Sequence, residues 1–201
     1  MTTPPYALER DAVRVAGPGA AAYLQSQATQ DLAPLAVGES AWTFFLQPTG
    51  RIDVLARVTR EADESFVLDT DVGFGEVLES RLRRFFIRVA ATIERLGTVL
   101  VEGEAGADPE AMEAQRVAAA WPAMGREIVP GEVIPAETGV VALTVNFRKG
   151  CYPGQELVER MDSRGARPPR ELRVVDVADL PDGLVPTSVA DGRALVYVPR
   201  G

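Results

Sequence analysis

The stretch "RKGCYPGQE", residues 148–156, holds the residues of this chain that are best suited to chemistry. Cys151 is the only cysteine among 201 residues, and Lys149 is the only lysine. A helix that begins within "GQELVERM" would place Cys151 just before a helix N-terminus, and this end together with two neighbouring cations favours a thiolate. The stretch therefore predicts a reactive or metal-ligating thiol, although a lone cysteine is most often a small buried hydrophobic side chain.

Two glycines shape the same stretch. Gly150 and Gly154 have no side chain, so the backbone there can bend sharply and approach a ligand closely. Pro153 stiffens the segment and favours an extended conformation at Tyr152. We therefore expect a constrained bend that leads from a strand into a helix.

Composition excludes several classes of site. The chain has no histidine, which removes Ser/His/Asp and Cys/His triads and most zinc sites. One cysteine can neither hold a whole iron–sulfur cluster, which takes four ligands, nor form an internal disulfide, and this fits a reducing cytoplasm. A net charge of −8 argues against general binding of nucleic acid. With no apolar run of the roughly 20 residues that a membrane span needs and no secretory signal, we expect a cytoplasmic protein.

Apolar periodicity predicts the elements that must position the bend. The expected strands are 6–16, both arms of a turn within 39–60, 65–71, 88–96, 98–103, 139–147, 171–177 and 193–198. The expected helices start at 18 or 19 and span 74–88, 109–120 and 155–161. Strands and helices that alternate with antiparallel-style turns predict an α+β fold.

The strand after the turn at 48–50 has a clear two-sided pattern. One face should carry Ile52, Val54, Ala56 and Val58, and the other Arg51, Asp53 and Arg57. In the helix 74–88, four arginines could bind a phosphate or a polyglutamate tail, but such a run is more often the solvated face of an amphipathic helix.

Several segments together resemble a known family. "KGCYPGQE" resembles the signature of the YgfZ-type folate-binding proteins, which are relatives of the aminomethyltransferase (T-protein) of the glycine cleavage system. "VAGPGAAAYLQSQATQDL", "LQPTGRI", "IPAET" and "SRGARPPREL" are similar to further family segments in the same order. The resemblance spans most of the chain.

The resemblance implies an intertwined folate-binding core of mixed and antiparallel sheets with flanking helices, followed by a small β-barrel. We assign the core to residues 1–170 and a truncated C-terminal β segment to residues 171–201. About 30 residues are too few for a closed barrel of ordinary strand length, so only a short remnant of the barrel is expected.

The resemblance also implies a function and a site. Members of this branch bind tetrahydrofolate or another reduced folate and support iron–sulfur cluster assembly or repair, and thereby tRNA modification. Expected partners are folate and iron–sulfur proteins or assembly factors, with Cys151 as one ligand of a transient cluster shared with such a partner. A pterin ring needs carboxylate or amide acceptors. The folate-binding candidates are Lys149, Gly150, Tyr152, Gly154, Gln155, Glu156, Gln25 and Gln27.

The alternative is a tetrahydrofolate-dependent aminomethyltransferase. Aligned on the turn at Gly50, the acidic pair of the T-protein falls on Val54 and Leu55, with Asp53 one position early. A one-residue offset on a strand turns the side chain to the other face, so Asp53 would not stand in for the acidic pair. The general base is then missing, and we expect the non-catalytic branch. A third possibility is an interaction module that has lost the ligand cavity.

Overall fold

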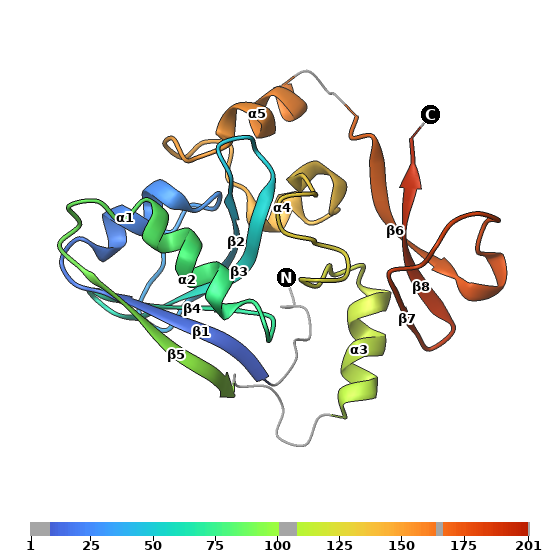
Figure 1. Ribbon diagram of the computed structural model, residues 1–201, viewed down its shortest axis with the longest axis horizontal. Coiled ribbons are helices and arrows are strands. Elements are labelled where there is room, and N and C mark those ends of the chain that lie inside the picture. Colours follow the sequence, from blue (N-terminus) through green and yellow to red (C-terminus); the bar gives the residue numbers. More distant parts are fainter. Residues whose placement is uncertain (1–8, 101–107, 164–166, 201) are drawn as a thin grey trace.

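The computed structural model describes residues 9–100, 108–163 and 167–200 (Figure 1). Its elements are β1 (Glu9–Ala16), α1 (Ala20–Gln27), β2 (Ser40–Leu46), β3 (Ile52–Ala62), β4 (Ser65–Thr70), α2 (Gly75–Arg84), β5 (Thr92–Leu100), α3 (Pro109–Ala118), α4 (Val141–Thr144), α5 (Gln155–Ser163), β6 (Arg170–Asp176), β7 (Ser188–Ala190) and β8 (Arg193–Pro199). Single 3-10 turns occur at Pro135–Glu137 and Val177–Asp179. Most of the expected elements are present, and the α+β class is confirmed.

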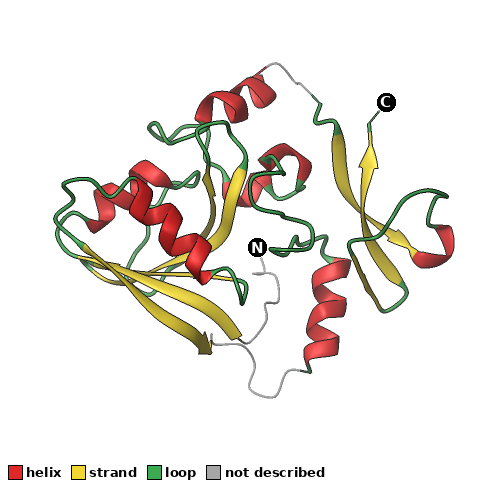
Figure 2. Ribbon diagram, viewed as in Figure 1, coloured by secondary structure: helices red, strands yellow, loops and turns green. Residues whose placement is uncertain are grey.

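Five strands form one antiparallel sheet in the order β2-β3-β4-β1-β5. Alternating apolar residues of these strands face α1 and α2, which cover one side of the sheet (Figures 1 and 2). Val13, Phe45 and Val54 from the sheet pack there with Leu24 of α1 and Leu82 of α2, and all five are fully buried. This packing fixes α1, whose C-terminal end contributes to the site described below.

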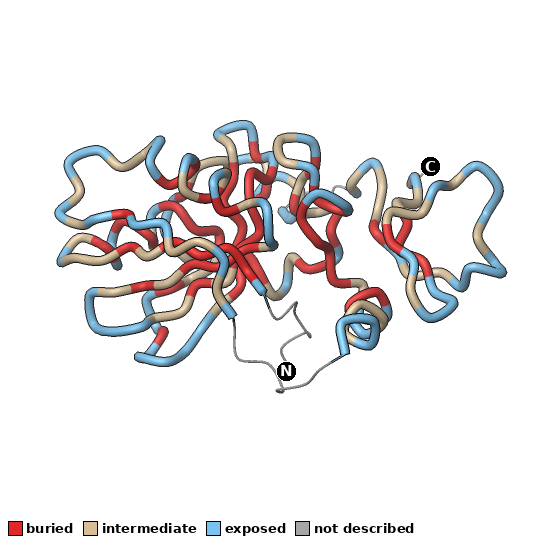
Figure 3. Tube along the Cα trace, turned by 60° about the horizontal axis from the view of Figure 1, so that its bottom comes forward, coloured by how far each residue is buried: buried red, intermediate tan, exposed pale blue. Residues whose placement is uncertain are grey.

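A second core lies on the opposite face of the sheet. There Trp42, Phe44 and Leu55 pack against Trp121 and Ile128 of the long irregular segment that follows α3. In Figure 3 the buried stretches of the chain, drawn in red, lie mostly in the interior, with exposed loops around them. Because both faces are covered, β2 and β3 are apolar along most of their length.

A β-bulge in β3 changes the expected two-sided pattern. Phe45 pairs with Val54 but Leu46 pairs with Ile52, so Asp53 is the extra residue that has no partner across the ladder. The bulge reverses the alternation, and Ile52 belongs to the core opposite the one that contains Val54. The expectation that these two side chains share a face was therefore wrong.

Three further predicted strands differ from the structure. Residues 88–96 and 98–103 were expected to form two strands, and 101–103 lie outside the described residues. Up to Leu100 a single strand, β5, runs through Gly97 with a bulge opposite Ala12 and Val13. The apolar run 139–147 was expected to be a strand but contains the short helix α4. A short apolar run without a neighbouring strand does not decide between helix and strand, and here Thr144 Oγ1 donates to the Val140 carbonyl within a helical turn.

The C-terminal residues form a separate three-stranded antiparallel sheet in the order β6-β8-β7 (Figure 2). Leu172 and Leu195 of this sheet pack against Val117 of α3. The sheet is open in the described residues, so its relation to a barrel stays a prediction, as does the domain boundary at 170/171, which falls at the first residue of β6. None of the helices in the described ranges combines the length and apolar character that a bilayer crossing requires.

Candidate functional site

The signature bend connects α4 to α5 and exposes its cysteine. Cys151 is a free, exposed thiol, so it is not the buried hydrophobic side chain that a lone cysteine usually is. The next residue, Tyr152, is buried in the second core. The thiol therefore stands at the point where the chain turns from solvent back into the protein.

Lys149 is bound to the end of α1. Its ammonium group donates to the carbonyl oxygens of Gln25 and Ala28, both at 2.5 Å, and of Gln30 at 3.2 Å. It also lies 5.4 Å from the centre of the Tyr152 ring. Burial lowers the pKa of Lys149 to about 8, and the nearby Asp31 carboxylate opposes this shift. All three donors of the ammonium group have a protein acceptor, so the described contacts do not present this cation to a ligand.

Gly154 holds the other side of the bend against the turn between β2 and β3. Its φ of +82° is in the left-handed region, and its Cα lies so close to that turn that an added Cβ would be 2.9 Å from the Cα of Gly50 and would collide with the Gln47 carbonyl oxygen. Gly150, in contrast, has open space where a Cβ would be. Of the two expected glycines, only Gly154 is required by a close backbone approach.

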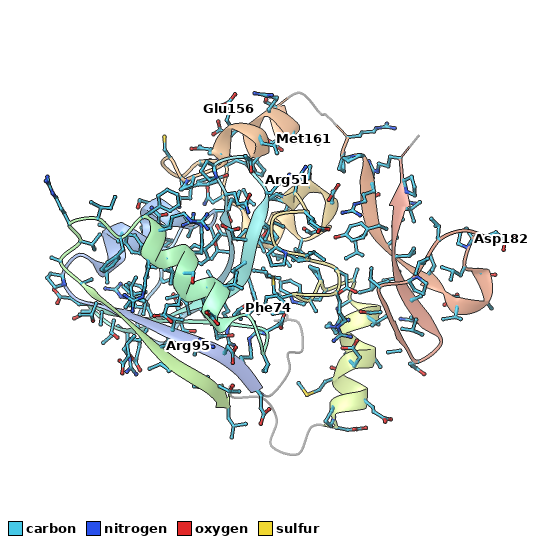
Figure 4. The ribbon with its side chains drawn as sticks, in the orientation of Figure 1. Arg51, Phe74, Arg95, Glu156, Met161 and Asp182 are labelled. Carbon is cyan, nitrogen blue, oxygen red and sulfur yellow. The ribbon has the colours of Figure 1, made fainter. Side chains whose placement is uncertain are left out.

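The polar residues after the bend interact with α5 itself. Gln155 accepts a hydrogen bond from the Tyr152 N–H at 3.3 Å and donates to Glu159 at 2.5 Å. Glu156 is 86% exposed and pairs with Arg160 one helical turn later (Figure 4). Burial raises the pKa of Tyr152 to about 12, and its hydroxyl has no hydrogen-bond partner among the described residues.

The two glutamines of α1 make structural contacts. The Gln25 amide donates to Asp31 at 2.8 Å and accepts from the Leu32 N–H at 2.8 Å. Gln27 accepts a hydrogen bond from Arg81 at 3.1 Å. Arg81 is 1% exposed and also donates two hydrogen bonds to the Leu46 carbonyl. For Arg81 the expectation of a solvated arginine face was therefore wrong, because its guanidinium group crosses the core to reach these acceptors.

Asp53 is a buried carboxylate that the strand pattern had placed on the opposite face. The bulge directs it toward α2, where its Oδ2 atom lies 3.5 Å from Arg81 Nε and 3.6 Å from Arg84 Nη1. Its Oδ1 atom accepts from Gln47 at 2.8 Å, and Oδ2 has no hydrogen-bond partner among the described residues. The simple offset argument could not locate this side chain, because a bulge resets the face of every residue beyond it.

A cavity of about 640 Å³ lies between α3 and the ends of β1 and β4, and it is the larger of the two that bear on the site. Its wall is mostly apolar, with Met112 of α3 and Trp121 and Met124 of the following segment. Cys151 does not line it, nor does it line a smaller apolar cavity of about 230 Å³ beside α5. The structure therefore separates the thiol from the larger cavity and does not gather the expected folate-binding residues around it.

Polar groups at the larger cavity are held by ion pairs. Arg10 binds Asp69 and also Asp71, the latter at 2.7 Å, and its guanidinium group lies 5.2 Å from the centre of the Trp42 ring. Within the described residues, Asp71 accepts one hydrogen bond on each oxygen, from Arg10 and from the Met124 N–H. Since each carboxylate oxygen can accept two, Asp71 keeps acceptor capacity toward the cavity.

A second ion-pair network joins α3 to the C-terminal sheet. Arg116 donates to Glu113 at 2.8 Å, to Glu127 at 2.9 Å and to Ser188 Oγ at 2.6 Å. The pKa of Glu113 is lowered to about 2, and the largest cause is its hydrogen bonding with Arg116. Arg116 therefore pairs with two carboxylates, Glu113 of its own helix and Glu127 of the following segment.

Among the described residues, no group of three or more His, Cys, Asp or Glu side chains could hold a metal ion. A cluster at Cys151 would therefore need further ligands from outside this part of the chain. No composition or spacing signal marked Asp71 or the cavity, because their neighbours come from five separate segments, namely 9–10, 71–72, 100, 109–116 and 121–126.

Of the comparisons with known proteins, the one with a solved structure bears on the fold. No family model matches the chain. Over 74 residues, 36% of this chain, it is 39% identical to a Chaetomium globosum protein named "Iron-sulfur cluster assembly factor IBA57 homolog, mitochondrial", and the match spans 15% of the length of that relative. The fold is similar to the crystal structure of the glycine cleavage system aminomethyltransferase T from Bartonella henselae, with a TM-score of 0.78, 16% identity, and coverage of 94% of this chain and 76% of that one. The chain therefore has the α+β fold of aminomethyltransferase T.

Proposed function

We propose that this protein is a folate-binding accessory factor for iron–sulfur cluster assembly or repair, with Cys151 as its working thiol. The observation that carries the proposal is the exposure of Cys151 on a bend that is anchored on both sides. The name of the Chaetomium globosum relative, a cluster assembly factor, supports the same role. Through cluster-dependent enzymes the role extends to tRNA modification, and a cytoplasmic location is part of the proposal.

The larger cavity is the place where a reduced folate fits. Its volume of about 640 Å³ is within the range of about 300–1,000 Å³ that is typical of ligand pockets. Trp121 offers an aromatic wall, and Asp71 offers carboxylate oxygens to the N–H edge of a pterin ring. Glu113 is a poorer acceptor, because Arg116 and Arg126 already donate to both of its oxygens. Bound there, the folate would serve as a carrier of one-carbon groups.

The cluster is cargo in this proposal. Cys151 contributes one thiolate, and a partner iron–sulfur protein or assembly factor contributes the remaining ligands. Because the thiol is exposed, a partner surface can approach it without rearrangement of the core. Separation of the thiol from the cavity suits such an arrangement, in which folate and partner occupy different faces.

Replacement of the thiol tests the functional claim. We expect Cys151→Ser to lose the ability to restore a cluster-dependent enzyme in cells that lack this protein, while Arg148→Met, at an exposed neighbouring position, retains it. Both variants should unfold at the wild-type temperature, since neither side chain is buried. Full restoration of enzyme activity by the serine variant would show that the thiol of Cys151 is not required.

Calorimetric titration with tetrahydrofolate tests the cavity. The wild type should bind it, and Met112→Trp, which fills the larger cavity from α3, should abolish binding. Met161→Trp, which fills the smaller cavity instead, should bind as the wild type does. Equal heats of binding for both tryptophan variants would show that folate does not bind in the larger cavity.

A second candidate, aminomethyl transfer to tetrahydrofolate, is favoured by one observation. The bulge leaves Asp53 buried with one oxygen that lacks a hydrogen-bond partner among the described residues, as a general base would be held. The test mixes the protein with tetrahydrofolate and methylamine or glycine-derived donors and measures methylene-tetrahydrofolate. Turnover that survives Cys151→Ser and is lost in Asp53→Asn would favour this candidate. Asp53 is absent from the lining of the larger cavity, and for this reason we prefer the first proposal.

A further inference from the structure

Helix α1 ends without any of the usual local caps. Its last turn contains no basic residue, and Ala28, rather than a glycine, follows in an extended conformation. The Ala28 N–H satisfies the Leu24 carbonyl, but the Gln25 carbonyl is among the last four, which have no partner within the helix. The negative end of the helix dipole adds to the need for a cation at this place.

The missing cap comes from a residue about 120 positions later in the chain. Lys149 Nζ binds the carbonyl oxygens of Gln25, Ala28 and Gln30. A single ammonium group therefore caps the last turn of α1 and also binds Ala28 and Gln30, which follow the helix. The same segment is also joined to the chain before the bend, where Thr29 Oγ1 donates to the Thr144 carbonyl at 2.6 Å. The end of α1 and the start of the bend are thus one connected unit.

We propose that Lys149 is the positioning residue of Cys151, because its ammonium group ties the thiol-bearing bend to the carboxyl end of α1. Tyr152 in the second core and Gly154 against the β2–β3 turn hold the other side of the bend. Between these fixed points only Gly150 and Cys151 extend into solvent, and an added Cβ at Gly150 would touch nothing. Release of Lys149 would move the nearest anchor before the thiol back to Asn146, whose N–H donates to the Thr29 carbonyl at 3.0 Å. The inference rests on the proposed function only in treating Cys151 as the working thiol.

Arg148 provides the matched control. It is a cation one position away, and it is exposed; its described hydrogen bond is from the backbone N–H to Asn146 Oδ1 at 2.8 Å. Arg148→Met and Lys149→Met remove the same charge from the same bend. Only Lys149→Met removes the three contacts with the end of α1, so a difference between the two variants reports those contacts and not the local charge.

Because the chain has a single cysteine, a nitroxide spin label attached to Cys151 reports the mobility of the bend without any further substitution. The electron paramagnetic resonance spectrum of the wild type should show a restricted label. In Lys149→Met the rotational correlation time of the label should shorten severalfold, and in Arg148→Met it should stay at the wild-type value. Equal label mobility in the wild type and Lys149→Met, with the fold retained, would overturn the proposal, as would equal loosening in both variants.

Two more variants keep the test decisive if Lys149→Met fails to fold. Lys149→Gln is neutral and too short to reach all three carbonyl oxygens, yet polar enough for a half-buried site, and its label should be mobile. Lys149→Arg keeps a cation with several donors and should restore part of the restriction. A residue that only stabilises the fold would lower the unfolding temperature in these variants but would leave the spectrum of the folded protein unchanged, and this result would refute a positioning role.

The outcome is independent of the function that we propose for the thiol. If the label loosens in Lys149→Met while Cys151→Ser fully restores the cluster-dependent enzyme, the positioning role stands and the proposed function fails. If the label spectrum is unchanged while Cys151→Ser abolishes restoration, the function stands and the positioning role fails. When both hold, Lys149→Met should restore less enzyme activity than Arg148→Met and should still bind tetrahydrofolate.

Discussion

Lys149 and Arg148 are adjacent cations with opposite surroundings. Arg148 extends into solvent, whereas Lys149 is half-buried with its ammonium group against three carbonyl oxygens. The sequence places both cations next to the thiol in the chain, and their effect on the thiol stays a prediction. It could not predict that Lys149 binds the end of α1, because the acceptors of Lys149 belong to residues that are distant in the chain.

The two glycines of the bend differ in the same way, and this difference gives a prediction. Gly154→Ala should destabilise the protein by about 2 kcal/mol or more, because a left-handed backbone costs an L residue about 1–2 kcal/mol and the new Cβ would also strike the β2–β3 turn. Gly150→Ala is the control. It should stay within about 1 kcal/mol of the wild type, since its site is open and its φ is not positive.

Urea unfolding followed by circular dichroism measures both free energies. Equal midpoints for the two alanine variants would mean that the bend does not depend on the contact between Gly154 and the β2–β3 turn.

At the scale of elements, the C-terminal sheet is docked by a buried ion pair. Glu127 is 1% exposed; it binds Arg116, and it accepts from Thr187 at 2.7 Å and Ser188 at 2.6 Å. Tyr197 of β8 donates to the Glu127 backbone carbonyl at 2.8 Å. Side-chain and main-chain groups of one residue therefore hold the sheet against the segment after α3.

Removal of this carboxylate should be costly. Glu127→Ala leaves the guanidinium group of Arg116 with Glu113 as its remaining carboxylate, and the loss of one partner of a buried pair typically costs about 3–5 kcal/mol. Glu156→Ala removes an exposed partner of an i,i+4 pair and should cost less than about 0.5 kcal/mol. Differential scanning calorimetry compares the two, and a Glu127→Ala protein as stable as Glu156→Ala would show that the sheet is held by its apolar contacts alone.

Most helices and strands could be predicted from the sequence, and the predictions that failed have a common cause. Strands and helices with ten or so residues of regular periodicity, such as 74–88 and 109–120, correspond to α2 and α3. The bulge at Asp53 and the helix α4 within 139–147 depend on neighbouring segments, and local periodicity contains no signal for them. The face of Asp53 was misjudged for this reason.

At the scale of the whole molecule, paired carboxylates should make the protein sensitive to acid. The pKa of Glu113 is about 2 in the folded protein, against an ordinary value of 4.5, so its ion pairs stabilise the fold at pH above 4.5 and this contribution is lost as the pH falls toward 2. Since one pKa unit corresponds to about 1.4 kcal/mol, the contribution is at most about 3 kcal/mol, and less after solvent screening of a side chain that is 28% exposed.

Glu113→Gln tests this dependence. The variant should be less stable than the wild type at pH 7, and the difference between their free energies of unfolding should shrink between pH 4.5 and pH 2, where the wild-type carboxylate becomes protonated. Urea unfolding at a series of pH values measures it. A constant difference across this range would mean that Glu113 titrates normally in the folded protein.

The sequence by itself determined what this protein lacks and where its chemistry is concentrated. The absence of histidine, the single cysteine and the glycine-rich bend around it depend on residue identity alone, and the resemblance of "KGCYPGQE" to a folate-binding signature depends on a contiguous string. Alternation of apolar residues was sufficient for an α+β fold, because burial on a sheet or helix face leaves a local period.

Only the tertiary structure decided which residues meet. It brought Lys149 to the end of α1, directed Asp53 toward α2 through a bulge, and placed the larger cavity away from Cys151. Each of these arrangements joins segments that are tens of residues apart, and such pairings are selected by the packing of the whole core. A local sequence pattern does not record them.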